Sequence, residues 1–208
     1  MSYSNLTAVQ KDVLKEIGNI GAGNAATALS VLLGERIEIE VPSVNVVSFD
    51  EMMELIGGPE ELITSLFFRI GGDAPSSVYL ILGMDEADNL ARRMTGPALA
   101  EQDQQNGMDA SALKEVANII TGTYLSALSE FTGLAFRPTV PHLGIDMAGA
   151  LLTVGLMQVS PFADHAIIID TKIQHEGGSD GIQGNFLMLP DPESLSTIFT
   201  SLGLEQNE

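Results

Sequence analysis

The chain contains no cysteine, which excludes several kinds of chemistry at once. Disulfide frameworks, thiol nucleophiles and thiolate metal sites all require that side chain. The sequence also lacks the basic and apolar pattern of a signal peptide, and its apolar runs are interrupted by Gly, Asn, Ser or Thr well before they could span a bilayer. We therefore expect a cytoplasmic protein without membrane insertion.

Basic residues are scarce, with 9 Lys and Arg against 28 Asp and Glu and a formal net charge of -19. Proteins that bind nucleic acid present a basic stripe to the phosphate backbone, and nothing in this sequence resembles one. Nucleic acid is therefore excluded as a partner. The acidic surplus is best explained by solubility or by adaptation to a salty cytoplasm.

Metal-site patterns are also missing. The three histidines, His142, His165 and His175, lack the close helical pairing and the neighbouring carboxylates of a zinc site. We expect surface or strand-end histidines, and neither a metal site nor a cofactor in this chain.

What the chain does contain is a repeat of itself. Residues 14–42 align without gaps on residues 113–141, at an offset of 99 positions, and 12 of the 29 aligned residues are identical. The chain has 208 residues, of which 45% are hydrophobic, so it can bury a sizeable core. We predict a single domain, residues 1–208, made of two internal repeats at about 5–100 and 109–203.

Hydrophobic periodicity predicts a similar order of elements in the two halves. After the first long helix, we expect a strand-like segment at 35–49, a helix at 50–57, strands at 62–72 and 76–83, and a helix at 85–94. After the second long helix, we expect a strand at 136–141, a helix at 144–157, strands at 165–174 and 181–190, and a helix at 191–203. The polar segment 101–109 is the expected joint between the halves.

The connections determine the predicted fold. Gly34, Gly133 and Gly203 supply C-terminal stops for helices, and the short hairpin-type connections favour antiparallel strands. We predict an α/β fold of the α+β type. In this fold, two halves related by a pseudo-two-fold axis pack long helices on a largely antiparallel sheet.

Each long helix carries a polar stripe. Three residues at spacings of four and three project from the same side of a helix: Asp12, Glu16 and Asn19 in the first half, and Ser111, Glu115 and Asn118 in the second. For one copy alone, the simplest explanation would be the solvated side of an amphipathic helix. Solvated positions change freely between diverged halves, yet Glu and Asn are kept while Gly18 faces Ala117 and Gly21 faces Ile120 in the alignment. Both stripes are therefore candidate functional sites.

Glycines interrupt the first of these helices at Gly18, Gly21 and Gly23, and each costs roughly 1 kcal/mol of helix stability relative to alanine. Glycine lets another backbone come close. The three positions therefore predict either tight helix packing or room for a docked partner beside Glu16 and Asn19. A phosphate cradle is disfavoured, because the segment GNIGAGN neither follows a predicted strand nor contains the P-loop lysine.

The complete pattern resembles the signature of the CheC/CheX/FliY family of phosphatases. It reads Asp or Ser, three residues, Glu, two residues, Asn, and then Pro after 22 more, and it occurs twice, ending at Pro42 and Pro141. The resemblance covers nearly the whole chain. It implies hydrolysis of the aspartyl phosphate on the chemotaxis response regulator CheY.

The resemblance also implies roles for the stripe residues. Asn19 and Asn118 are expected to hold a water in line with phosphorus, as a glutamine does in GTPases. Glu16 and Glu115 are expected to pair with the lysine of the response regulator's active site. The response regulator brings its own divalent ion, Mg²⁺, so this reaction needs no cofactor from the present chain.

The remaining signature residues have supporting roles in this scheme. Asp12 and Ser111 support the pairs from the preceding helical turn, whereas Pro42 and Pro141 shape the chain after the helix and do no chemistry. Because Asp12 becomes Ser111 and the glycines differ, access to the two sites can differ, but we expect both to hydrolyse.

A second partner implied by the resemblance is CheD, the receptor deamidase. The segment 144–153 resembles the family's CheD-docking helix, which makes Asp146 a candidate contact. The alternative is an ordinary core helix with Asp146 near its N-terminus, where the helix dipole favours a carboxylate.

Two other functions compete with the phosphatase. One is a non-enzymatic adaptor that binds CheY or regulates CheD and keeps its Glu/Asn pairs for docking. The other is a flagellar-switch component like FliY, and the chain's ending soon after the second half argues against an additional switch-binding domain. We expect the protein to be a monomer when it is alone.

Overall fold

The computed structural model describes residues 6–95, 108–159, 165–175, 181–191 and 193–204. The first half contains α1 (Ala8–Leu33), β1 (Ile37–Glu40), β2 (Val44–Ser48), α2 (Phe49–Leu55), β3 (Leu62–Gly72), β4 (Ser76–Gly83) and α3 (Met84–Thr95). The second half contains α5 (Met108–Thr132), β5 (Phe136–Pro138), β6 (His142–Met147), α6 (Ala148–Val159), β7 (His165–His175), β8 (Ile182–Pro190) and α7 (Ser194–Ser201). Both halves follow the order helix, two strands, helix, two strands, helix.

The strands of both halves join one eight-stranded sheet in the order β1-β7-β8-β4-β3-β5, with β2 also on β7 and β6 also on β3. Each of these pairings is antiparallel, as predicted. β4 and β8 form the centre, with Leu80 opposite Phe186. The sequence left open whether the halves share a sheet, and the structure shows that they do.

The first two strands of each half pair with a strand of the other half. β1 and β2 pair with β7, whereas β5 and β6 pair with β3. The exchange is reciprocal. Strands at the same distance from the two edges of the sheet, β1 and β5, β7 and β3, and β8 and β4, are equivalent strands of the two halves. This symmetry confirms the predicted α+β fold with two pseudo-two-fold-related halves.

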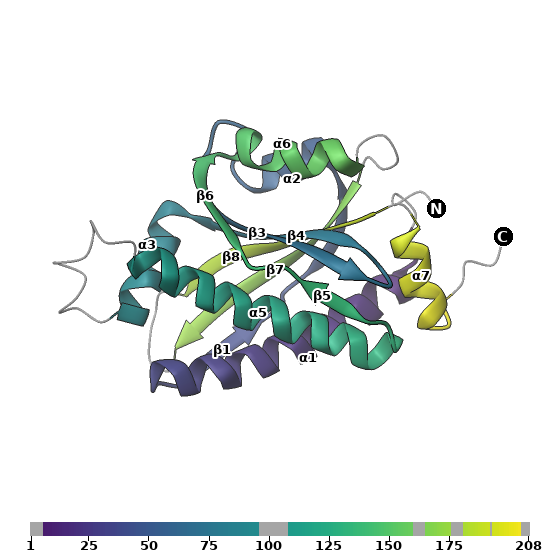
Figure 1. Cartoon of the computed structure of the whole chain (residues 1–208), viewed down its shortest axis with the longest axis horizontal. Helices are drawn as coiled ribbons and strands as arrows, with labels where there is room; N and C mark the ends of the chain where they lie inside the picture. The colour runs from purple at the N-terminus through teal and green to yellow at the C-terminus, as the bar shows by residue number, and fades with distance from the viewer. Residues whose placement is uncertain (1–5, 96–107, 160–164, 176–180, 192, 205–208) are drawn as a thin grey trace.

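Helices cover both faces of the sheet (Figure 1). α1 and α5 cover one face, with α3 and α7 at their ends, and α2 and α6 cover the other. The two central strands alternate between the two interiors, as strand geometry requires: Phe186 and Met188 face the larger core under α1 and α5, and Leu187 and Leu189 face the smaller core under α2 and α6. This burial on both faces explains the continuous apolar runs at 78–82 in β4 and 186–190 in β8.

Glycine ends the long helices as predicted. Gly34 has a φ of 68° and Gly133 a φ of 70°, the left-handed conformation that an added side chain would strain. The N–H of Gly34 donates to the Ser30 carbonyl (3.0 Å), and that of Gly133 to the Ser129 carbonyl (2.8 Å). Both long helices therefore end at equivalent positions and direct the chain toward the sheet.

One predicted helix was placed too early. The helix expected at 144–157 begins only at Ala148, and residues 144–147 belong to β6. There Ile145 lies opposite Thr64 and Met147 opposite Leu62 of β3. Hydrogen bonding to β3, a strand some eighty positions earlier, outweighs the local helical pattern. The sequence of the segment alone does not reveal this pairing.

Other boundaries also differ from the sequence analysis. The strand expected at 136–141 ends at Pro138, and the helix expected at 191–203 spans Ser194–Ser201. The strand-like segment 35–49 is divided into β1 and β2 around Pro42, and α2 already begins at Phe49. Of the joint expected at 101–109, residues 101–107 lie outside the described residues, and the last two positions belong to α5. No helix in the described part of the chain is both long and apolar enough to cross a membrane.

Candidate functional site

The first candidate site lies on α1, which begins at a well-defined cap. Thr7 Oγ1 accepts from the Gln10 N–H (3.2 Å), and Gln10 Oε1 accepts from the Thr7 N–H (2.9 Å), a reciprocal capping box. Gln10 Nε2 also donates to the Leu204 carbonyl (3.1 Å), just after α7. These bonds fix the start of the helix about one turn before the polar stripe.

The polar stripe of α1 faces away from the core. Asp12, Glu16 and Asn19 are exposed, whereas Leu14 and Ile17 are buried in the larger core. The period of 3.6 residues separates these two sets. The helix therefore presents its carboxylates and its carboxamide on a rigid surface.

The second candidate site repeats this arrangement on α5. Ser111, Glu115 and Asn118 are exposed, whereas Leu113 and Val116 are buried. Each sequence-predicted Glu/Asn pair is thus placed together on one exposed helix face. The two pairs belong to different helices and make two separate candidate sites.

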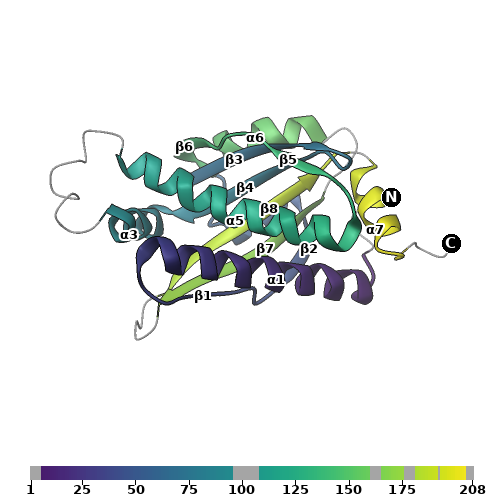
Figure 2. The same cartoon turned by 60° about the horizontal axis from the view of Figure 1, so that its bottom comes forward.

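α1 and α5 lie side by side and run in opposite directions (Figure 2). Gly21 of α1 is packed so closely that a Cβ at this position would lie 2.9 Å from Tyr124 Cα. Tyr124 also stacks on Phe186 of β8, with ring centroids 4.8 Å apart. Gly21 therefore provides tight helix packing, one of the two explanations that the sequence left open for the glycines.

Glu16, Asn19, Glu115 and Asn118 have side chains that are free to meet a partner. Within the described part of the chain, these four side chains have no hydrogen-bond or ion-pair partner. Charged side chains elsewhere in the described part of the chain do form such pairs; for example, Arg69 forms a bidentate contact with Asp191, which raises the pKa of Arg69. The two Glu/Asn pairs thus resemble a binding surface more than a structural network.

Lys15, which precedes Glu16, connects α1 with the signature proline Pro42. Its Nζ donates to the Pro42 carbonyl (2.9 Å) in the bend between β1 and β2. Pro141 occupies the equivalent bend between β5 and β6 but is buried, whereas Pro42 is exposed. Both prolines follow short edge strands, and the structure places neither on the helix face of the stripe.

Asp146 lies apart from both stripes, on the edge strand β6. It is exposed, and its Oδ1 accepts from the Met147 N–H (2.8 Å). It precedes by two residues the helix α6, which begins at Ala148 and buries Ala148 and Leu152, so its position also agrees with the alternative explanation by the helix dipole. Its neighbours Ile145 and Met147 are 57% and 45% exposed, and Leu62, opposite Met147, is 55% exposed.

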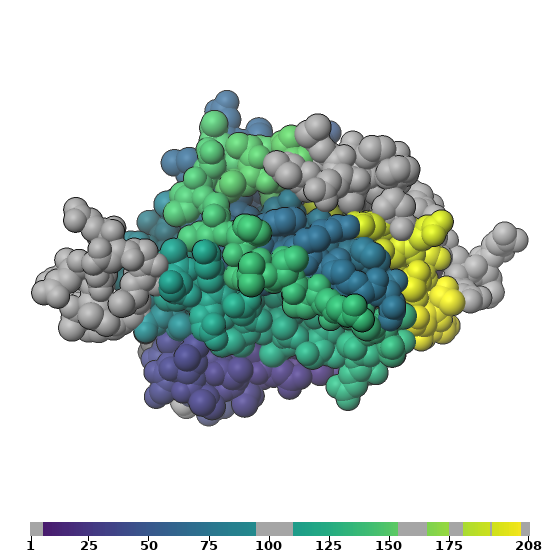
Figure 3. All heavy atoms as spheres, viewed as in Figure 1, coloured from purple at the N-terminus to yellow at the C-terminus, as the bar shows by residue number. Residues whose placement is uncertain are grey.

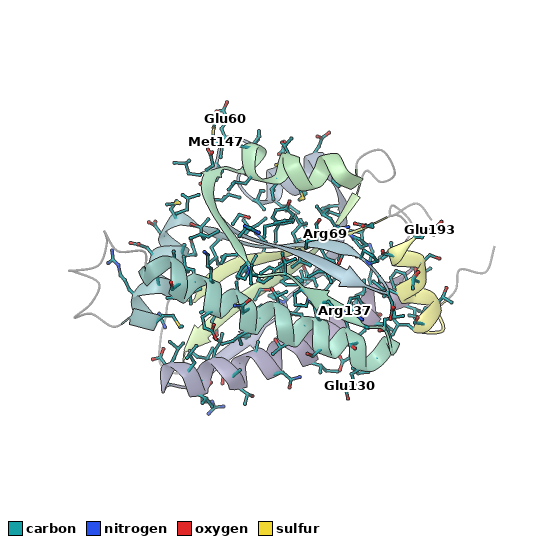
Figure 4. All side chains as sticks on the ribbon, in the orientation of Figure 1. Glu60, Arg69, Glu130, Arg137, Met147 and Glu193 are labelled. Atoms are coloured by element: carbon teal, nitrogen blue, oxygen red, sulfur yellow. The ribbon has the colours of Figure 1, made fainter. Side chains whose placement is uncertain are left out.

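Sequence reasoning missed a hollow beside the second site. It has a volume of about 480 Å³ and lies between α5 and the β5 strand, lined mainly by Gly122, Leu125, Ser126, Ser129, Phe136 and Pro138. Figure 3 shows α5 on this side of the molecule, between α1 and the β5–β6 segment. Figure 4 labels Glu130, which also borders the hollow. The identity of Gly122 with Gly23 in the repeat alignment was the one available signal.

A metal centre is not evident among the described residues, where no three His, Asp or Glu side chains are grouped to hold an ion. His142 is an exposed residue of β6.

Comparison with known proteins gives an independent view of the repeat. The model of the CheC-like family matches residues 9–46 and again residues 108–145, at the same 99-position offset as the aligned segments. A protein named CheY-P phosphatase CheC, from Bacillus subtilis, is 37% identical over 203 residues, which cover 97% of each chain. The flagellar motor switch phosphatase FliY of the same organism is 29% identical over 126 residues, covering 60% of this chain and 32% of FliY.

A solved structure shows the same fold. The crystal structure of FliY from Thermotoga maritima superposes with a TM-score of 0.73, at 22% identity, and the match covers 97% of this chain and 99% of that one. The likeness extends over both halves and over the shared sheet. It therefore supports the fold independently of the sequence signature.

Proposed function

The chain belongs to the CheC-like family, and from this premise we propose that it is a CheY-P phosphatase with two active sites. Its B. subtilis relative carries that name at 37% identity over 97% of both chains. In this proposal, the protein acts in the cytoplasm on the aspartyl phosphate of the response regulator, by means of the Glu/Asn pairs of α1 and α5.

The observation that carries the proposal is the repeated presentation of each pair. Glu16 and Asn19 are exposed on one face of α1, and Glu115 and Asn118 occupy the equivalent face of α5. None of the four is bonded to another described residue. Side chains held on a rigid helix without internal partners can enter the active site of another protein with little rearrangement.

The asparagines suit the chemistry of acyl phosphate hydrolysis. An aspartyl phosphate already contains a reactive bond, so the step requires a water positioned in line with phosphorus. A carboxamide can accept from that water with its oxygen and donate to it with its nitrogen, and so orient it. Asn19 and Asn118 have this role in our proposal, and the Mg²⁺ of the reaction belongs to the response regulator.

The glutamates suit docking. A carboxylate one turn before the asparagine can form a charge-assisted hydrogen bond with a lysine of the response regulator. Glu16 and Glu115 would thereby set the position of the asparagine relative to phosphorus. Asp12 and Ser111 would support these contacts from the preceding turn.

The test is phosphate release from phosphorylated CheY with Mg²⁺. We expect Asn19→Ala and Asn118→Ala each to lose part of the acceleration, and the double variant to lose it by on the order of 100-fold, because a misplaced reactant costs about that much. Asn24→Ala is the matched control, since Asn24 is exposed on α1 but lies off the stripe. Unaltered hydrolysis by the double variant would refute the catalytic assignment.

A second candidate function, docking of CheD, is favoured by the edge of β6. Asp146 lies there beside exposed Ile145 and Met147, and Figure 4 shows Met147 far from α1. We expect Asp146→Lys to abolish CheD binding and to leave phosphate release unchanged, as measured by calorimetry and by the phosphatase assay. Wild-type CheD affinity in this variant would exclude the edge of β6. An adaptor without catalysis would bind CheY and CheD and fail the phosphatase assay.

A further inference from the structure

Gly23 and Gly122 are two glycines that the fold itself does not require. Each lies in the interior of a long helix, Gly23 in α1 and Gly122 in α5. A Cβ built at either position has no neighbouring atom within 4 Å among the described residues, apart from its own helix backbone. Glycine in a helix interior is unfavourable relative to alanine, so its presence needs a cause outside the internal packing.

Gly21 differs from Gly23 in its surroundings. At Gly21, a Cβ would collide with Tyr124 Cα at 2.9 Å, which explains that glycine by packing. At Gly23, only two residues later, the same Cβ would point into open space. The two halves differ at the packing position, where Gly21 corresponds to Ile120, and agree at the open one, where Gly23 corresponds to Gly122.

Their position connects both glycines with the candidate sites. Gly23 lies four residues after Asn19, and Gly122 lies four residues after Asn118. Residues four apart project from the same side of a helix. Each polar stripe therefore continues into a bare stretch of helix backbone directly beyond its asparagine.

We propose that the main chain of the phosphorylated response regulator lies against Gly23 at one site and against Gly122 at the other. This inference rests on the proposed function. It adds the docking contact that lets the asparagine reach far enough into the active site of the response regulator. A side chain at either position would hold the partner's backbone away from the helix. The water-positioning carboxamide would then fall short of phosphorus.

The hollow at the second site supports the same contact. Gly122 opens directly onto it, together with Ser126 and Phe136. The two halves differ here at the serine that faces the next strand, Ser30 in the first half and Ser129 in the second. In the first half, the Ile37 N–H donates to Ser30 Oγ (2.8 Å) and holds β1 against α1, whereas Ser129 donates instead to the Leu134 carbonyl (2.7 Å).

The second half lacks the equivalent bond, and β5 packs less extensively against α5 than β1 does against α1. At the second site, a side chain of the docked segment thus has a space to enter next to Gly122. The two sites share the glycine contact, and the second one adds a receptacle for a side chain.

The experiment compares a variant carrying Gly23→Ala and Gly122→Ala with one carrying Gly23→Leu and Gly122→Leu. Binding is measured to CheY loaded with Mg²⁺ and beryllofluoride, a phosphoryl analogue that is not hydrolysed. We expect both variants to melt at or above the wild-type temperature, because helix formers replace glycine in open space. The alanine pair should bind more weakly than wild type, and the leucine pair at least ten-fold more weakly, with a matching loss of phosphate release.

Thr200→Leu is the matched control, since it adds an apolar side chain to an exposed position of α7; it should bind like wild type. Wild-type affinity in the leucine pair would overturn the inference and leave the proposed function intact. Wild-type protein that neither binds loaded CheY nor hydrolyses CheY-P would refute the proposed function, and this inference with it. A change in sedimentation of the chain alone, with CheY binding unaltered, would assign the glycines to a second copy and overturn the proposal.

Discussion

Tyr124 is the residue through which the helix pair and the sheet are held together. Its Cα faces Gly21 of α1, and its ring stacks on Phe186 of the central strand β8. It lies six residues after Asn118 on α5, on the buried side of the helix that carries the second site. This one residue thus contacts α1 and the sheet at the same time and helps to place the two helices relative to each other.

The burial of Tyr124 has a consequence at high pH. Burial raises the pKa of the Tyr124 phenol, whereas a tyrosine in the unfolded chain ionises near pH 10. The stability that the neutral phenol contributes is therefore fully present below about pH 10 and is lost as the pH rises from there toward the raised pKa of the folded state. We expect the free energy of unfolding to fall more steeply above about pH 10 for wild type than for Tyr124→Phe, as measured by urea titration. Identical pH dependence of the two proteins would contradict this.

At this scale, the exposure of the Glu/Asn pairs could be predicted from the sequence, whereas the contacts of the neighbouring residues could not. The exposure of Glu16 and Asn19 follows from helical periodicity alone, which is a local property. The bond from Lys15 to the Pro42 carbonyl spans 27 positions and depends on where β1 turns. The openness at Gly23 could be known only once every other element was in place.

At the scale of the element, the glycines of α1 lie close together in the sequence but differ in the space around them. A Cβ added at Gly18 would make an ordinary contact with Val41 Cγ1 at 3.6 Å, whereas at Gly21 it would meet backbone at 2.9 Å. The helix therefore tolerates a side chain at one of these positions and excludes it at the other, only three residues away.

This difference predicts opposite signs for the same substitution. Gly21→Ala should lower the free energy of unfolding by about 1–3 kcal/mol, because overpacking forces the backbone of α5 to move. Gly18→Ala should leave stability unchanged or raise it by up to about 1 kcal/mol, since alanine favours the helix. Denaturant titration of both variants against wild type checks this, and equal effects at the two positions would disprove the packing argument.

Element types were predictable wherever the local pattern was long. The two long helices and the hairpins β3–β4 and β7–β8 follow from periodicity over eight or more residues. The segment 144–147 was predicted as helix because it continues into one, and it becomes strand because β3 offers it a hydrogen-bonding partner. Such pairing depends on distant sequence, which explains the error.

At the scale of the whole molecule, the exchange of edge strands makes each half incomplete without the other. β1 and β2 have their sheet partner in β7, and β5 and β6 have theirs in β3. The central pairing of β4 with β8 also crosses between the halves. The larger core is shared between residues of both halves, so neither half could bury its apolar surface alone.

We therefore predict that the halves fold only together. A fragment of residues 1–100 and a fragment of residues 101–208, produced separately, should each lack cooperative unfolding. Mixed, they should recover the circular dichroism of the intact chain, because the strand exchange and the central pair require both. A fragment that melts cooperatively by itself would contradict the prediction that the chain is a single domain.

The central position of β8 also matters while the chain is being made. On a ribosome, β4 is complete long before Ile182, the first residue of β8, has been added. Until then, β4 lacks its inner neighbour, and the apolar strand has an open edge that other chains can pair with. Nascent chains that stall before β8 should therefore be the ones that aggregate or recruit chaperones, whereas released chains that contain β8 can close the sheet from its middle.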